Sequence, residues 1–186
     1  MRRIILIAGF CAWAAALVLF WLHFRTSRYD YIVGQAAARN GVDFHLVKAL
    51  IYEESWFRSG IRGSAGELGL MQITRAAGLD YCLHKGFPPL GDEELLEPEL
   101  NVEIGCWYLK YSLDHYKNTP NPTLFGLLRY NAGESRANNW LRLALASNPP
   151  PGVSMEDHYL SQVNFPKTRS YVRRILKRSR SRRYWF

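Results

Sequence analysis

An uninterrupted apolar run at residues 4–22 most constrains what this chain can fold into. A helix of this length can cross the roughly 30 Å hydrocarbon core of a bilayer, because a helix rises about 1.5 Å per residue. Arg2 and Arg3 precede the run, and Arg25 and Arg28 follow it. The sequence therefore predicts an N-terminal transmembrane helix within residues 1–28. The charges on its two sides are nearly equal, so they do not set its orientation.

A cleaved signal peptide is the alternative for this segment. The apolar part of a signal peptide is usually about 7–15 residues long, which is shorter than this run. The best cleavage site is the alanine triplet at residues 14–16, and cleavage there leaves residues 17–22 as an apolar new N-terminus. A retained membrane anchor is the better interpretation.

The net charge of +8 is concentrated at the two ends of the chain. The first 28 residues hold four arginines, the last 18 hold eight basic residues, and neither segment has an acidic residue. Residues 29–168 hold 12 basic and 16 acidic residues, so the body is mildly acidic. The overall basic balance therefore does not by itself indicate a nucleic-acid-binding domain. Hydrophobic residues make up 48% of the chain, enough for a folded core.

Sequence signatures of cofactors and metals are absent. The chain has no phosphate-binding or dinucleotide-binding glycine motif, no C-x-x-C and no H-E-x-x-H. Its five histidines show no ligand spacing. We therefore expect neither a cofactor nor a metal. Cys82 and Cys106 could form a disulfide if the domain lies outside the cytoplasm, or could be two small unpaired residues.

The segment after the apolar run shows helical patterns, and alternating strand patterns are scarce. Asp43 suits the N-cap of a helix over residues 44–57, and Pro98 suits the first turn of a later helix. Four glycines at every third position over residues 60–69 predict a tight loop that leads into a short helix ending at Ala77. Further helices are expected over residues 98–116, 123–131 and 136–146, with a last one from residue 168.

One carboxylate lies on the apolar face of the first predicted helix of the domain. At about 100° per residue, Glu54 falls between Leu50 and Val47 in the apolar stripe, and Glu53 falls toward its edge. Burial disfavours an ionised carboxylate and raises its pKa, which is what a general acid near neutral pH requires. The alternative is a structural glutamate that pairs with a basic side chain or with backbone amides.

Three short strings follow one another in a fixed order. Glu-Ser at residues 54–55 is followed by Gly-Leu-Met-Gln-Ile at 69–73 and by Tyr-Asn-Ala-Gly at 130–133. This ordered set resembles the catalytic domain of the lytic transglycosylases of the soluble type, which share their fold with G-type lysozyme. Segments 42–50, 100–109 and 165–172 are also similar to that family. The resemblance implies a mainly α, lysozyme-like transglycosylase domain behind the N-terminal transmembrane helix.

The resemblance also implies roles for individual residues. Glu54 matches the catalytic acid and base of the family. Gln72 and Met71 match residues that line the sugar cleft, Tyr130 matches a tyrosine whose hydroxyl is close to the catalytic carboxylate, and Asn131 matches a residue of the cleft wall. Three of these residues have a named structural alternative: Met71 as a core methionine, Tyr130 as a half-buried aromatic ring and Asn131 as a helix-capping residue.

The chain departs from the family pattern at three places. Gly63 stands where the family often has a serine, which leaves one hydroxyl contact to substrate open. Thr74-Arg75 replaces the usual Met-Pro, and Lys167 replaces a glutamate in the closing segment. None of these changes alters Glu54.

The function implied by the resemblance is cleavage of the β-1,4 bond between N-acetylmuramic acid and N-acetylglucosamine in peptidoglycan. The family reaction forms a 1,6-anhydromuramic acid end with one carboxylate and no water. Lysozyme-type hydrolysis is the alternative, and it usually needs a second carboxylate. Glu67 and Glu134 are candidates for it, each with an exposed loop carboxylate as the alternative, and Glu53 is the remaining acid nearby. A peptidoglycan-binding or assembly factor with little activity is a second alternative.

These interpretations give an expected organisation of the chain. Residues 1–28 form the membrane anchor, residues 29–178 the catalytic domain, and residues 179–186 a basic tail. We expect a single-pass protein of the inner, cytoplasmic membrane with its catalytic domain on the periplasmic side, acting on peptidoglycan glycan strands. The basic tail lacks a nucleic-acid-reading motif, so anionic lipid or wall polymer is the expected contact and a solvated helix end is the alternative.

Overall fold

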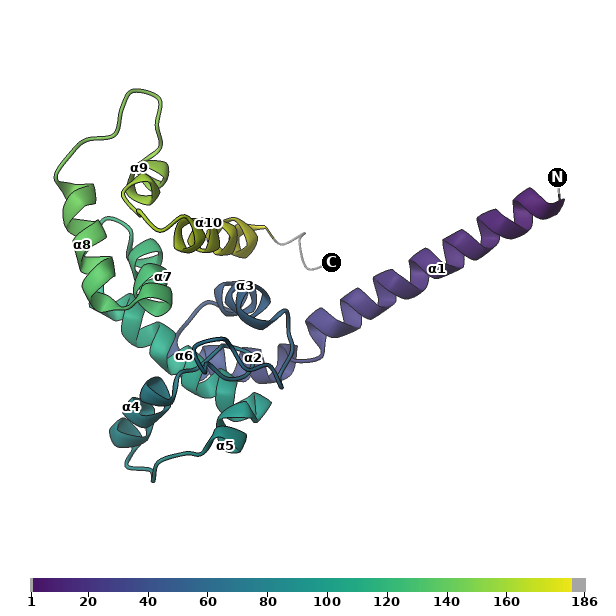
Figure 1. The fold of residues 1–186 in the computed structure, drawn as a ribbon, viewed down its shortest axis with the longest axis horizontal. Helices are drawn as coiled ribbons and strands as arrows, with labels where there is room; N and C mark the ends of the chain where they lie inside the picture. The colour runs from purple at the N-terminus through teal and green to yellow at the C-terminus, as the bar shows by residue number, and fades with distance from the viewer. Residues whose placement is uncertain (1, 182–186) are drawn as a thin grey trace.

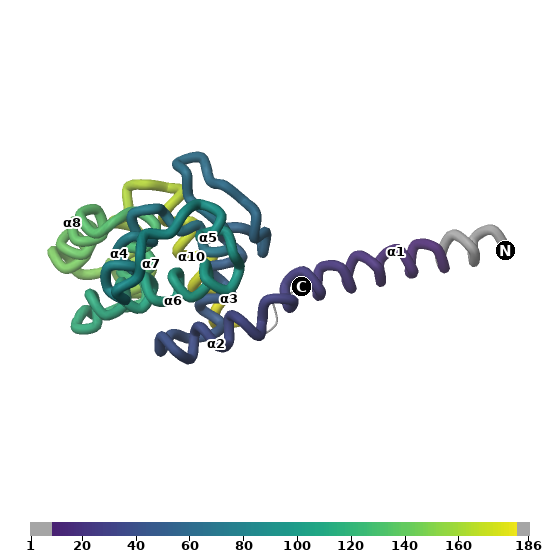
Figure 2. Tube along the Cα trace, turned by 90° about the horizontal axis from the view of Figure 1, so that it is seen from below, coloured from purple at the N-terminus to yellow at the C-terminus, as the bar shows by residue number. Residues whose placement is uncertain are grey.

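The helix α1 (Arg2–Ser27) extends away from the other helices as an isolated rod (Figures 1 and 2). In this computed structural model the backbone is described for residues 2–181 and the side chains for residues 9–181. The apolar side chains of α1 are largely exposed, with Trp13 at 62% and Phe20 at 68%. Within the described residues, one helical stretch, Gly9–Asn40, is long and apolar enough to cross a membrane. A signal sequence near an N-terminus meets the same criterion.

The rest of the described chain folds into short helices that gather around α6 (Figure 1). Helix α6 packs against α2, α4, α5 and α7, and α3 packs against α2 and α10. The bounds of these helices are α2 (Asp30–Asn40), α3 (Phe44–Ser55), α4 (Arg75–Lys85), α5 (Asp92–Leu96), α6 (Pro98–His115), α7 (Pro122–Ala132), α8 (Glu134–Leu145), α9 (Met155–Ser161) and α10 (Pro166–Arg180). The predicted mainly α architecture is confirmed.

The predicted start of α3 is confirmed at the level of its cap. The side chain of Asp43 accepts a hydrogen bond from the amide of Leu46 at 2.7 Å, which satisfies one of the donors that a helix start leaves open. The apolar stripe of α3, which includes Val47 and Leu50, is fully buried. The stripe fixes which face of α3 points inward, and it therefore also directs Glu54 toward the interior.

Two predicted boundaries are wrong. The helix expected to end at Ala77 instead begins at Arg75, because the hydroxyl of Thr74 caps the amide of Ala77 at 3.1 Å and the glycine-rich loop continues to that point. The helix expected to reach Phe57 ends at Ser55, because the next two residues adopt left-handed φ angles of 55° and 56°. Helices α2, α5 and α9 were not assigned from the sequence.

Arg25 near the end of α1 and Arg28 just after α1 hold the strained turn that follows α3. Trp56 and Phe57 are non-glycine residues with positive φ, which costs backbone energy. The guanidinium group of Arg25 donates to the carbonyl of Trp56 at 2.8 Å, and that of Arg28 donates to the carbonyl of Phe57 at 2.8 Å. The last turn of α1 therefore belongs to the folded domain, and experiments on this protein are best done with the full chain.

The loop between α3 and α4 is fixed by one buried amide side chain. Asn101 on α6 is fully buried, accepts from the amide of Met71 at 2.8 Å and donates to the carbonyl of Leu68 at 2.8 Å and that of Leu95 at 2.7 Å. Gly69 has a φ of 76°, and a Cβ there would lie 2.4 Å from the Asn101 amide nitrogen. This close approach explains the glycine.

We expect Asn101→Ala to lower the free energy of unfolding by about 2 kcal/mol, because three buried backbone groups lose their partner. Denaturant unfolding of the full chain in detergent measures the change. Asn139→Ala is the matched control, since Asn139 is exposed. Equal effects of the two substitutions would show that Asn101 does not brace the loop.

Candidate active site

Glu54 lies near the C-terminal end of α3 and faces α10. The hydroxyl of the buried Tyr171 donates a hydrogen bond to Oε1 of Glu54. The apolar stripes of α3 and α10 pack against each other, and this packing brings together two residues that are 117 positions apart. The predicted inward direction of Glu54 thus places its carboxyl group between two helices.

Burial raises the pKa of Glu54 from 4.5 to about 7. The hydrogen bond from Tyr171 favours the ionised form and acts in the opposite direction, whereas the negative charges of Glu67 and Glu53 raise the pKa further. A carboxyl group with a pKa near 7 can donate a proton and later accept one at neutral pH. The geometry therefore suits a single acid and base.

Glu54 opens onto a cavity of about 230 Å³. Three parts of the chain form its wall: the end of α3, the loop between α3 and α4, and the end of α7. The lining residues are Glu54, Gly63, Ser64, Glu67, Gln72, Thr74, Tyr130 and Asn131. Four of the five residues singled out from the sequence, Glu54, Gln72, Tyr130 and Asn131, are thus brought together here.

Gln72 shapes the loop side of the cavity. Its backbone has a φ of 48°, an unusual conformation for a residue other than glycine. Its side-chain amide donates to the carbonyl of Gly69 at 2.9 Å and to that of Ile61 at 3.4 Å. These bonds hold the amide against the loop, while the residue remains partly exposed to the cavity.

Met71 is placed differently from the expectation that it lines the sugar cleft. Its side chain is fully buried and packs onto α6, where a Cβ at Gly105 would lie 2.3 Å from its sulfur. This is the core position considered as the alternative. Its backbone still contributes to the site, because the hydroxyl of Tyr130 donates to the Met71 carbonyl at 2.9 Å.

The hydroxyls of the two tyrosines near Glu54 donate hydrogen bonds to different groups. Tyr130 lines the cavity, and burial together with the charge of Glu54 raises its pKa well above 10, so its hydroxyl keeps its proton. The Tyr130 hydroxyl donates a hydrogen bond to a backbone carbonyl, that of Met71, whereas the hydroxyl that contacts Glu54 belongs to Tyr171. Tyr171 received no role from the sequence. The available signal was its position in the apolar stripe of the last helix.

The three other carboxylates considered from the sequence differ in their ion pairs and in whether they line the cavity. Glu134 pairs with Arg129 at 2.9 Å, which lowers the pKa of Glu134, and it is not among the residues that line the cavity. Glu53 is nearly buried and pairs with Arg174 at 2.6 Å and Arg178 at 3.5 Å. Glu67 alone of these three lines the cavity with Glu54.

We expect Tyr171→Phe to lower the turnover number on soluble glycans about tenfold, because Glu54 loses a hydrogen bond that orients it. The pKa of Glu54 should also rise, so the loss of activity on the alkaline side should move to higher pH. A pH profile of turnover measures both effects.

Tyr130→Phe is the matched comparison for this prediction. It makes the same change at the other tyrosine near Glu54, but it removes a hydroxyl that bonds to the Met71 carbonyl rather than to Glu54. An equal upward movement of the alkaline limb in both variants would contradict the specific role of Tyr171.

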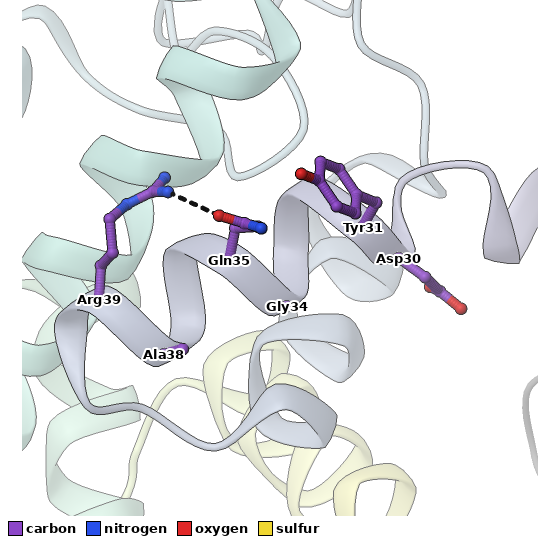
Figure 3. Close-up of a pocket in the computed structure, with 6 residues that line it drawn as sticks. All are labelled: Asp30, Tyr31, Gly34, Gln35, Ala38 and Arg39. Carbon is purple, nitrogen blue, oxygen red and sulfur yellow. Dashed lines mark hydrogen bonds between the residues drawn. The ribbon is translucent and has the colours of Figure 1, made fainter.

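A second hollow of the surface, along α2, offers less chemistry. Figure 3 shows this hollow of about 500 Å³, where Arg39 donates to Gln35 at 3.3 Å and Asp30 points away from both. Arg39 also pairs with Glu103 at 2.8 Å, and Asp30 pairs with Lys48 at 2.7 Å. These charged groups already have partners within the protein, so this hollow is a poor candidate for catalysis.

Cys82 and Cys106 are both buried and unpaired with each other. Burial raises the pKa of the Cys106 thiol, which makes it unreactive at neutral pH. Of the two options left open from the sequence, the structure has the two separate small core residues.

Comparison with known proteins identifies the fold around this cavity. The chain is similar to the 70-kDa soluble lytic transglycosylase in complex with bulgecin A, with a TM-score of 0.71 and 24% identity, covering 82% of this chain and 24% of that one. It is also similar to an inactive mutant of lytic transglycosylase Slt from Pseudomonas aeruginosa, with a TM-score of 0.69 and 22% identity, covering 82% and 23%. The predicted lysozyme-like fold is confirmed.

Sequence relatives point the same way. The chain is 30% identical over 129 residues to the soluble lytic murein transglycosylase of Salmonella typhimurium, covering 69% of this chain and 19% of that protein. It is 29% identical over 115 residues to membrane-bound lytic murein transglycosylase F of Desulfosudis oleivorans, covering 60% and 23%. The chain thus spans about a fifth of the length of these relatives.

The family match covers most of the domain but stops before α10. Residues 31–149 match the transglycosylase SLT domain, and this range contains Glu54, Gln72, Tyr130 and Asn131. Tyr171 lies beyond it. The resemblance drawn from the three short strings is confirmed: the chain belongs to the transglycosylase SLT domain family.

Proposed function

We propose that this chain is a membrane-anchored peptidoglycan lytic transglycosylase. It cleaves the β-1,4 bond between N-acetylmuramic acid and N-acetylglucosamine and leaves a 1,6-anhydromuramic acid end. The single observation that carries the proposal is the carboxyl group of Glu54, which has a pKa of about 7 and opens onto a polar cavity. Membership of the transglycosylase SLT domain family supports it.

Glu54 performs both proton transfers in this mechanism. It first gives its proton to the glycosidic oxygen, and the bond from that oxygen to C1 of the muramic acid breaks. The N-acetyl group of the sugar stabilises the positive charge that develops at C1. Glu54, now ionised, takes the proton of the C6 hydroxyl, and the C6 oxygen bonds to C1. The proton balance closes, so Glu54 ends protonated and no water is consumed.

The surrounding residues hold the acid and the sugar in place. Tyr171 orients the carboxyl group of Glu54 from α10. Gln72 and Asn131 present polar groups to the sugar, and the ring of Tyr130 forms a wall of the cavity. Met71 acts through its backbone, because its carbonyl fixes the Tyr130 hydroxyl.

The membrane placement is part of the proposal. Residues 1–28 anchor the chain in the inner membrane as a single span, and residues 29–178 form the catalytic domain on the periplasmic side, where peptidoglycan is found. The exposed apolar surface of α1 supports an anchor, and relatives include proteins named membrane-bound lytic murein transglycosylases. Glycan strands are the substrate, and the membrane is the other partner.

Anionic lipid or wall polymer is the proposed contact of the basic C-terminal tail, residues 179–186, although part of the positive charge just before the tail and at its start is neutralised within the chain. Within α10 and its end, Arg173, Arg174, Arg178 and Arg180 each pair with a carboxylate of the same chain. Residues 182–186 lie outside the described residues. Salt further weakens any remaining attraction.

Digestion of purified sacculi by the full chain in detergent tests the proposed function. Mass spectrometry of the released muropeptides should find 1,6-anhydromuramic acid ends. Sacculi that bind the protein but release no muropeptides would instead support a binding or assembly factor. Release of muropeptides with reducing ends alone would replace the transglycosylase by a lysozyme-type hydrolase.

A further inference from the structure

Glu67 is the second carboxylate of the cavity, and a tight turn aims it there. The turn is closed by a hydrogen bond from the Gly63 amide to the Glu67 carbonyl at 2.7 Å. The amide of Ala65 donates to Oε2 of Glu67 at 3.1 Å, so the side chain folds back over its own turn. The loop therefore holds the carboxylate in one place.

Gly63 makes room for this carboxylate. A Cβ at position 63 would lie 2.3 Å from Oε2 of Glu67 and 2.6 Å from Oε1 of Gln72. Any side chain at this position would have to displace Glu67. Gly63 is one of the departures from the family pattern, which often has a serine there. The glycine therefore leaves the space that the carboxylate of Glu67 occupies.

The cavity is large enough for the water molecule that a second carboxylate would activate. Its volume of about 230 Å³ exceeds by several fold the roughly 30 Å³ that one water molecule occupies in the liquid. A carboxylate offers about four acceptor positions, and the Ala65 amide uses one of them. Glu67 thus keeps acceptor capacity for a water molecule, whereas Glu53 and Glu134 are committed to arginine partners.

We propose that Glu67 is a second catalytic residue, which activates a water molecule in the cavity so that part of the cleavage ends in hydrolysis. The proposal rests on the proposed function, because Glu54 remains the acid. Glu54 gives its proton to the leaving oxygen, and the bond from that oxygen to C1 breaks. The water oxygen bonds to C1, and Glu67 takes the proton of the water; proton exchange with solvent then returns Glu67 to its ionised form and Glu54 to its protonated form. The product is a reducing muramic acid end in place of the anhydro end.

The two products report on two different residues. We expect the wild-type full chain in detergent to release both reducing and 1,6-anhydro ends from sacculi. In water enriched in oxygen-18, the reducing ends should carry the label at C1. We expect Glu67→Gln to lower the ratio of reducing to anhydro ends at least tenfold, since a general base contributes about 10²–10⁴-fold. A folding defect would lower both products together and leave the ratio unchanged.

A second variant reaches the same carboxylate without altering it. Gly63→Ser places a Cβ where Oε2 of Glu67 lies, so it should displace the carboxylate and also lower the ratio. Glu134→Gln is the matched control and should leave the ratio unchanged, because Glu134 faces Arg129 outside the cavity.

Two results overturn the assignment of Glu67 while the proposed function stands. One is a wild type that releases anhydro ends alone. The other is a product ratio that Glu67→Gln and Gly63→Ser leave unchanged. Failure of the proposed function looks different, because the wild type then releases either neither product or reducing ends alone.

Discussion

Glu54→Gln should lower the cleavage of sacculi by at least about a thousandfold. Glutamine keeps the size of the side chain and can still accept the hydrogen bond from Tyr171, but it cannot donate a proton and recover it. If one residue performs both transfers, the substitution removes the general acid and the general base together, and each contributes about 10²–10⁴-fold. The rate of muropeptide release by the full chain in detergent measures the loss.

Binding should survive this substitution, because Gln72, Tyr130 and Asn131 remain in the cavity wall. A pull-down with sacculi therefore separates loss of chemistry from loss of folding. Glu53→Gln, the neighbouring change on the same helix, is a poor control, since Glu53 is nearly buried and pairs with two arginines of α10. Glu99→Gln, at an exposed position, is the better one. A Glu54→Gln variant that cleaves as fast as wild type would disprove the assignment of the acid.

The direction of Glu54 could be predicted because it depends on local periodicity. The apolar stripe of α3 repeats every three to four residues, so the wheel alone turns Glu54 inward. The cap at Asp43 is equally local, since the side chain contacts an amide three residues away. Features of this kind depend only on residues within one or two turns of a helix.

The partner of Glu54 could not be predicted for the opposite reason. The stripe of α10 shows that Tyr171 is buried, but it does not show that α10 packs on α3. Met71 and Gln72 illustrate a second limit: adjacent residues in an irregular loop point in opposite directions, and the left-handed φ of Gln72 decides which one faces the cavity. The sequence could not separate Glu67 from Glu134 as a second carboxylate, because helical periodicity does not give the direction of a side chain in an irregular loop.

The second large effect is on stability: Glu54→Gln should stabilise the fold above pH 7. The pKa of Glu54 is raised from an ordinary value of 4.5 to about 7, so the folded state holds this proton more tightly than the unfolded state. The stabilisation from the protonated carboxyl is complete below about pH 4.5 and is lost as the pH rises toward 7. Each pKa unit corresponds to about 1.4 kcal/mol, so the loss is about 3 kcal/mol.

Glutamine does not ionise and therefore escapes this loss. The difference in the free energy of unfolding between Glu54→Gln and wild type should grow by about 3 kcal/mol from pH 4 to pH 8. Denaturant unfolding of the full chain in detergent at pH 4, 6 and 8 measures it, with Glu99→Gln as the control that shows no such trend. A difference that stays constant with pH would mean that Glu54 is not held in a desolvated site. If it grows as expected, the burial that makes Glu54 a useful acid is also what destabilises the folded protein at neutral pH.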